Sequence, residues 1–230
     1  MRCEGSIFHL LPPFLLDLSH VESPPSSDGP ESCFDKPTLK STSTFQNFAH
    51  HLHTNTIGPL LTAQYLLSLS SPPTTSTGLP VSPTWGPSTP LTVRTLVFIS
   101  SDSGSTTNFR AFEDGFGAYA ASKAALNQGL RHLAAELERK NRWKRREEKT
   151  VVLALHPGEV STDMANVNLD WDVEGIITPR ESIACMLKVI SEKGWGGVDE
   201  GGHVTSVTDG MKEETGAATF WTWEGKRYPW

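Results

Sequence analysis

Short apolar runs alternate with helix-forming stretches in the second half of the chain, and this order constrains the fold most strongly. The apolar runs are Leu96–Ile99, Val151–Leu155 and Thr219–Trp223, and stretches of helical composition at 119–139 and 179–190 separate them. Runs of this length are typical of strands buried on both faces. Strand, helix, strand, helix, strand predicts a parallel sheet joined by right-handed crossovers. We therefore expect an α/β fold.

The first part of the chain is organised differently. Residues 1–44 contain one plausible short strand, Phe14–Leu18, and are otherwise rich in Ser, Pro, Asp and Thr, which is typical of loops. Residues 45–67 suit a helix with a kink at its internal proline. Residues 68–90 are dominated by Ser, Thr and Pro and are expected to form a surface insertion. We expect a degenerate, loop-rich segment at 1–44 and one domain at 45–230.

Composition excludes several classes of protein. The net charge of −6, from 20 basic and 26 acidic side chains, argues against a nucleic-acid-binding protein. Three cysteines, Cys3, Cys33 and Cys185, form no disulfide framework, which suits a reducing compartment. No apolar run approaches the roughly 18 residues of a membrane span. The pair Pro12-Pro13 breaks the apolar stretch near the N-terminus, so we expect a cytoplasmic chain without a membrane segment.

A cluster of histidines precedes the predicted kink. His51 and His53 are two residues apart and so do not share a helix face, and no cysteine or acidic partner lies at the usual spacing for His50, His51 or His53. We expect no metal site here, and a solvated helix segment instead.

Tyr119 and Lys123 are four residues apart on a predicted helix, so they share a face. A phenol with its ordinary pKa near 10 is a poor acid–base catalyst at neutral pH. A nearby ammonium favours the phenolate and lowers that pKa, which lets the tyrosine exchange a proton with an alkoxide. The alternative is a surface tyrosine beside a solvated lysine.

Polar residues follow two predicted strands at the edge where parallel sheets bind ligands. Ser101 comes directly after the first strand, where its hydroxyl could bond a carbonyl oxygen, while strand alternation turns Ser100 away. After the next strand, Pro157 and Gly158 would let the backbone approach a planar ligand, and Thr162 could bond a carboxamide. The alternatives are a serine that caps the local backbone and an ordinary turn.

Together these motifs resemble the short-chain dehydrogenase/reductase family, and within it the C-factor-like or sniffer-like carbonyl reductases. The matching stretches, in chain order from about residue 45 onward, are His53–Pro59, Val97–Ser105, Tyr119–Asn127, His156–Met164 and Thr219–Trp230. Each motif is modest alone, but their shared order and spacing are specific. The resemblance implies a Rossmann-like, doubly wound parallel sheet.

The resemblance also implies roles for individual residues. Tyr119 would be the acid–base residue, and Lys123 would lower its pKa and hold the nicotinamide ribose. Ser101 would orient the substrate carbonyl, and Asn55 would hold a water in a proton relay behind Lys123. Three residues would flank the nicotinamide: Pro157, Gly158 and Thr162.

The implied reaction is hydride transfer between NADP or NAD and a small carbonyl or alcohol. Family members commonly pair through helices equivalent to 55–67 and 119–139, so we expect a homo-oligomer, either a dimer or a tetramer. The sequence identifies neither the substrate nor the preferred nucleotide.

One part of the family pattern is missing from the sequence. The glycine-rich turn that carries the cofactor pyrophosphate has no counterpart before Asn55, where Gly5 and Gly29 stand isolated. We therefore expect an incomplete N-terminal half of the sheet, with the strand Leu96–Ile99 at its edge and the apolar faces of that strand uncovered. Several lost charge-assisted bonds, each about 1.5–3 kcal/mol, would weaken cofactor binding from micromolar to beyond millimolar. The alternative hypothesis is an inactive remnant that pairs with a full-length homologue.

Overall fold

Three apolar strands form a parallel sheet in the computed structural model, which describes residues 42–70, 91–109, 117–143, 149–162, 175–204 and 218–230. The strands are β1 (Thr95–Ile99), β2 (Val151–His156) and β3 (Thr219–Thr222), and they lie in that order. Thr95 faces Val151 across the first pair, and Leu153 faces Thr219 across the second. The predicted α/β fold of the Rossmann-like type is confirmed.

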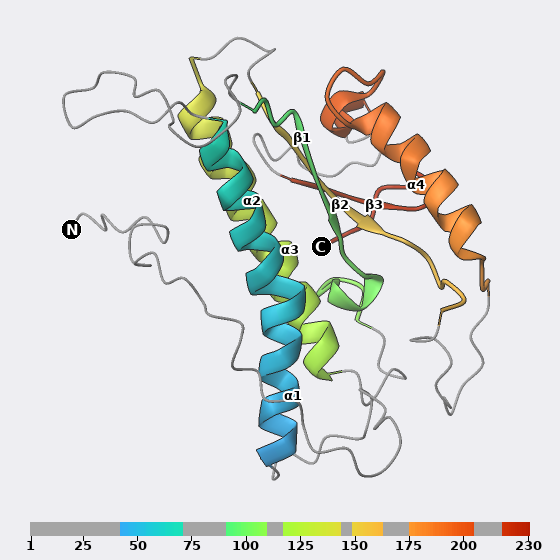
Figure 1. Ribbon diagram of the computed structural model, residues 1–230. Coiled ribbons are helices and arrows are strands. Elements are labelled where there is room, and N and C mark those ends of the chain that lie inside the picture. The colour runs from blue at the N-terminus through green and yellow to red at the C-terminus, as the bar shows by residue number, and fades with distance from the viewer. Residues whose placement is uncertain (1–41, 71–90, 110–116, 144–148, 163–174, 205–217) are drawn as a thin grey trace, which may run out of the picture. The chain divides into compact units, whose positions relative to one another are not determined.

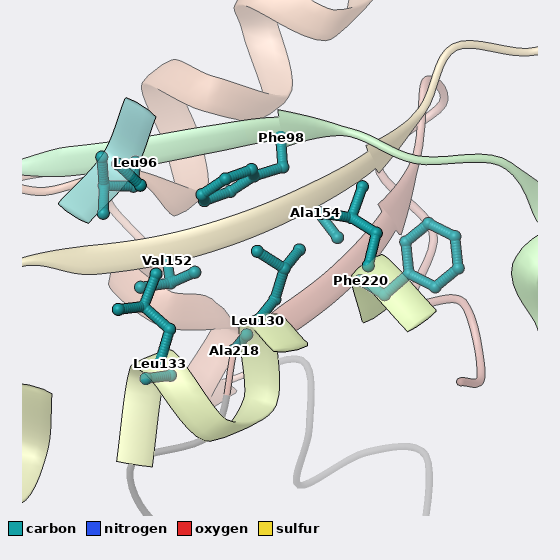
Figure 2. Close-up of a cluster of buried hydrophobic side chains, with 11 residues drawn as sticks. Leu96, Phe98, Leu130, Leu133, Val152, Ala154, Ala218 and Phe220 are labelled. Atoms are coloured by element: carbon teal, nitrogen blue, oxygen red, sulfur yellow. The ribbon is translucent and has the colours of Figure 1, made fainter. Parts of the chain in front are cut away.

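Side-chain alternation gives the sheet two buried faces, each covered by a different helix (Figure 1). On one face Phe98, Ala154 and Phe220 pack against α3 (Gly117–Asn141), as Figure 2 shows. The other face is covered by α4 (Pro179–Lys193), and the residues that meet there are Leu153, Leu155, Trp221, Met186, Val189 and Ile190. A strand buried on both faces reads as a continuous apolar run, as β2 does.

The two crossover connections have opposite hands. Both advance across the sheet in the same direction, β1 to β2 through α3 and β2 to β3 through α4, yet α3 and α4 cover opposite faces. Two such connections can share a hand only when their helices cover the same face. The prediction that all crossovers are right-handed is therefore wrong for one of the two. A doubly wound sheet usually covers its second face by reversing its direction across the sheet, whereas the three described strands follow one another without such a reversal.

One long helix, in three parts, precedes the sheet. α1 (Thr42–Leu52) continues through a π-helical turn, η3 (His53–Ile57), into α2 (Gly58–Leu69). The N–H of Gly58 bonds the carbonyl of His53, five residues back. Pro59 has no N–H, so it cannot donate to the carbonyl of Asn55 four residues earlier. The predicted helix is confirmed, and its irregularity is this widened turn just before the proline.

The start of α4 is fixed by its capping residues. The Thr178 side chain accepts a bond from the Glu181 N–H, while the Glu181 carboxylate accepts one from the Thr178 N–H. Pro179 takes the first helical position, where no N–H is needed. Beyond α4 a short 3-10 turn, η7 (Glu200–Gly202), leads toward β3. Throughout the described ranges, no helix combines the length and apolar character that crossing a membrane would require.

Within the described residues β1 is an edge strand, as expected. A cavity of about 460 Å³ lies beside it, lined by η3, α2, β1 and α3. Leu96 and Phe98 are nonetheless buried against the helices, and Ile99 at the strand end is 48% exposed. The expectation of uncovered apolar faces is therefore wrong for the face that bears Leu96 and Phe98, and it holds in part for the opposite face, where Val97 is half-buried and Ile99 is exposed. The predicted strand Phe14–Leu18 and nearly all of the predicted insertion lie outside the described residues.

Candidate active site

Tyr119 and Lys123 lie in the first turns of α3, on one face of the helix. The Lys123 Nζ atom is 5.6 Å from the centroid of the Tyr119 ring and donates a hydrogen bond of 3.0 Å to the backbone oxygen of Ile99. Lys123 is only 8% exposed. Burial lowers the pKa of the Lys123 ammonium below its ordinary value, because desolvation penalises the charged form. The alternative of a solvated surface lysine is therefore wrong.

Asn55 is joined to the same turn of α3 through a buried serine. The Asn55 amide donates to the Ser122 hydroxyl at 3.0 Å, and Ser122 in turn donates to the backbone oxygen of Tyr119 at 2.7 Å. Thr56, the next residue of η3, donates to the backbone oxygen of Ser122 at 2.7 Å. Ser122 is fully buried, at 0% exposure. The π-helical turn is thus anchored where α3 carries Tyr119 and Lys123.

The chain after β1 is held against α3. Ser100 donates to the Asn127 side chain at 2.6 Å, and Asn127 donates to the backbone oxygen of Gly104 at 3.1 Å. A Cβ atom at Gly104 would stand 2.7 Å from the Cβ of Lys123, so only glycine permits this approach. The short turn η4 (Asp102–Gly104), which begins just after Ser101, therefore lies directly beside Lys123.

Ser101 is buried at the end of β1, and its hydroxyl is engaged within its own turn. It donates to the Asp102 carboxylate at 3.0 Å and accepts a bond from the N–H of Ser103 at 3.2 Å. The backbone N–H of Asp102 donates to His156 Nδ1 at 3.3 Å, which ties the exits of β1 and β2 together.

A set of three side chains at this edge of the sheet has the composition of a metal site. Asp102, His156 and Glu159 each offer a ligand atom within 4.8 Å of the others. Two of those groups already take part in hydrogen bonds: the Asp102 carboxylate accepts from Ser101 and Ser103, and His156 Nδ1 accepts from the Asp102 N–H. We therefore interpret the set as a hydrogen-bond network rather than a cation site.

Of the three residues expected to flank the nicotinamide, Pro157 and Gly158 are held by packing and backbone geometry. Ser182 in α4 donates to the backbone oxygen of Pro157 at 2.7 Å. Gly158 has φ +84°, and a Cβ atom there would stand 2.7 Å from the Trp223 indole. That space is thus filled by Trp223, which differs from the expected opening toward a planar ligand. Thr162 is exposed at the end of the described segment.

His51 is the histidine that departs from expectation. His50 and His53 are exposed as predicted, but His51 is buried, and its ring meets the Tyr119 ring edge-on with centroids 6.0 Å apart. The prediction of a solvated segment is therefore wrong at this position. The helix periodicity places His51 one turn before Asn55, on the side that faces α3.

Sequence reasoning missed Ser122, Thr56, Asp102 and His156 as parts of the site. Ser122 carried one usable signal, because a small polar residue three positions after Tyr119 can bond back to its carbonyl. Asp102 and His156 come together through the parallel register of β1 and β2, so neither is recognisable from local sequence.

Two fungal proteins are similar to this chain in sequence. An uncharacterized oxidoreductase of Saccharomyces cerevisiae is 34% identical over 148 residues, which cover 61% of this chain and 47% of that protein. An uncharacterized oxidoreductase of Schizosaccharomyces pombe is 35% identical over 108 residues, which cover 42% of this chain and 39% of that protein. The chain thus spans half or less of the length of these relatives. No protein-family model matches it.

Solved structures share the fold. The NADPH-bound carbonyl reductase from chicken fatty liver is 25% identical with a TM-score of 0.52, covering 84% of this chain and 60% of that one. Carbonyl reductase Sniffer of D. melanogaster is 20% identical with a TM-score of 0.53, covering 90% and 64%. A Burkholderia multivorans short-chain dehydrogenase/reductase with bound NADP is 17% identical with a TM-score of 0.54, covering 87% and 62%.

Proposed function

We propose that this chain, whose resemblance to the carbonyl reductases of the short-chain dehydrogenase/reductase family is confirmed in sequence and fold, is an NADP-dependent oxidoreductase of a small carbonyl or alcohol. One observation carries the proposal. A buried Lys123 ammonium lies 5.6 Å from the Tyr119 ring on the same helix face, next to the strand end that bears Ser101. Burial makes the charge more effective, because little water screens it.

Proton transfer would take place at the Tyr119 hydroxyl. The Lys123 ammonium favours the phenolate, so Tyr119 can give its proton to a developing alkoxide and later recover it. Asn55 and Thr56 hold the Ser122 turn, which keeps this face of α3 in place. The Ser101 hydroxyl lies at the sheet edge where the substrate oxygen would bind.

The residues present suit the nicotinamide end of a cofactor. An ammonium has three donors, and the Ile99 carbonyl takes one at Lys123, which leaves donors for ribose hydroxyls. The nicotinamide, when bound, supplies or accepts the hydride. Pro157, Gly158 and Thr162 would flank it. NADP is favoured over NAD because the chicken structure contains NADPH. Because the sequence contains no glycine-rich pyrophosphate loop, we expect weak affinity.

The first experiment is a titration of the purified, folded chain with NADPH and with NADH, followed by tryptophan fluorescence. We expect quenching that continues to rise in the millimolar range and that is stronger for NADPH. Turnover of NADPH with para-nitrobenzaldehyde then tests the chemistry. Tyr119→Phe should lower turnover by about 10²–10⁴, because the proton donor is removed.

The matched control for this variant is Tyr65→Phe, since Tyr65 is 66% exposed on α2 and lies outside the proposed site. It should leave turnover unchanged. Equal turnover by Tyr119→Phe and the unmodified chain, or a folded chain that binds neither nucleotide, would contradict the proposal.

A further inference from the structure

The Ser101 hydroxyl proton is directed at a carboxylate. Ser101 donates to Asp102 Oδ1 at 3.0 Å, and the same oxygen accepts the Ser103 N–H at 2.8 Å. A hydroxyl has one proton and two acceptor positions. With the proton on Asp102 and one acceptor position taken by the Ser103 N–H, the remaining position on the Ser101 oxygen is an acceptor. Ser101 is therefore polarised to receive a hydrogen bond.

The Asp102 carboxylate is held firmly in this orientation. It is buried, as is Ser101, and its own backbone N–H is bonded to His156 Nδ1. The nearest Asp102 oxygen is 3.6 Å from the same ring nitrogen. The centroids of the His156 and Tyr228 rings are 6.0 Å apart. Contacts from both strand exits thus hold the Asp102 carboxylate that accepts the Ser101 proton.

We propose that Asp102 is a positioning residue that turns the Ser101 proton away from the substrate oxygen, so that the resting site suits an alcohol better than a carbonyl. The inference rests on the proposed function. While Tyr119 still holds its proton, an alcohol can accept a bond from the Tyr119 hydroxyl and donate its own O–H to the Ser101 oxygen without disturbing the network. A carbonyl has no proton to donate, so its binding requires the Ser101 proton to leave Asp102.

Asp102 also acts on the transition state. When the Ser101 proton turns to the substrate, the carboxylate loses a hydrogen bond and faces the negative charge that develops on the substrate oxygen. A donor aimed at that oxygen stabilises the charge, while a nearby carboxylate opposes it. Removing the carboxylate charge should therefore speed the reaction in both directions and strengthen carbonyl binding in particular.

Neutron diffraction from crystals of the unmodified chain in D₂O tests the orientation directly and needs no activity. We expect the deuterium of Ser101 on the line from its oxygen to Asp102. A deuterium that points away from Asp102, or one that is bonded to the carboxylate, would overturn the proposal. Because this result does not depend on turnover, failure of the proposed function and failure of this inference are distinguishable.

Kinetics of Asp102→Asn test the consequence, with para-nitrobenzaldehyde and its alcohol as probes. Asparagine keeps an oxygen for the Ser103 N–H, and its amide can donate to the Ser101 oxygen. We expect kcat/KM to rise about tenfold in both directions, because both share one transition state. The ratio of the aldehyde KM to the alcohol KM should fall about tenfold.

The control is Glu192→Gln at the far end of α4, near the residues that contact the start of β1, and it should change neither quantity. A fall in kcat/KM with an unchanged KM ratio in Asp102→Asn would show that Asp102 is merely structural and would overturn the proposal.

Discussion

The region around Tyr119 and the region after β2 are built in different ways. Tyr119 and Lys123 are fixed by a chain of side-chain hydrogen bonds that reaches η3 and β1. Pro157 and Gly158 are shaped by a positive φ, an indole and one serine from α4. The first region is held by hydrogen bonds of its own side chains, whereas the shape of the second depends on the packing of β3 and α4. A mutation near Tyr119 should therefore change the rate of the chemical step, and a mutation after β2 should change cofactor binding.

The strongest test of this separation is Lys123→Met, which removes the buried ammonium. We expect turnover of NADPH to fall by about 10²–10³, because Tyr119 loses the charge that favours its phenolate. The Gly158 region should keep its stability in this variant. Hydrogen exchange of the β3 amides would check this, and faster exchange there would show that the two regions are coupled.

The same variant changes the pH dependence of stability. The pKa of Lys123 is lowered in the fold, so between that pKa and the ordinary value of 10.5 the unfolded chain binds more protons than the folded one. The free energy of unfolding therefore contains a gain as pH rises through this window. Lys123→Met should lack that gain in urea titrations at successive pH values.

Gly158→Ala tests the packed region. An alanine at this position has to adopt the left-handed backbone conformation, which costs about 1–2 kcal/mol. Its Cβ also meets the Trp223 indole, which adds about 1–3 kcal/mol. Gly175→Ala is the matched control, because Gly175 has φ +73° and nothing within 4 Å of the added atom. Urea unfolding should show a larger loss in the free energy of unfolding for Gly158→Ala than for Gly175→Ala. Equal losses would show that the Trp223 indole moves aside at no cost.

A pair of serine variants gives the smallest expected effects. Ser122→Ala should cost about 1–3 kcal/mol, because the Asn55 amide loses its acceptor in a buried place. Ser182→Ala should cost about 1 kcal/mol, because the Pro157 oxygen loses one donor. We expect the first to lower kcat and the second to raise the KM for NADPH. The opposite pairing of effects would contradict the division into two regions.

Much of the fold was predictable from local sequence. The three strands and the helices α3 and α4 lie within a few residues of their predicted bounds, because apolar runs and helical composition are local properties. The hand of the crossovers was not predictable in this way. It depends on which face of the sheet each helix covers, and both faces of β2 are apolar.

The site divides along the same line. Tyr119 and Lys123 were recognisable because a four-residue spacing fixes a shared helix face. Asn55 could be placed only through the family resemblance, and its bond to Ser122 spans 67 residues of chain. The link between Asp102 and His156 spans 54 residues. Contacts across such separations follow from the register of packed elements, which no short motif contains.

The π-helical turn His53–Ile57 also makes the chain unusually sensitive to length. Its hydrogen bond from the Gly58 N–H runs five residues back instead of four, so the turn holds one residue more than a turn of α-helix. Deleting one residue here would close the turn to a regular α-helix, which keeps Ala63 on the side of the core but removes the widened turn that brings Asn55 to Ser122. A one-residue gap in this turn therefore removes the anchor on α3 while it leaves the rest of the helix in place.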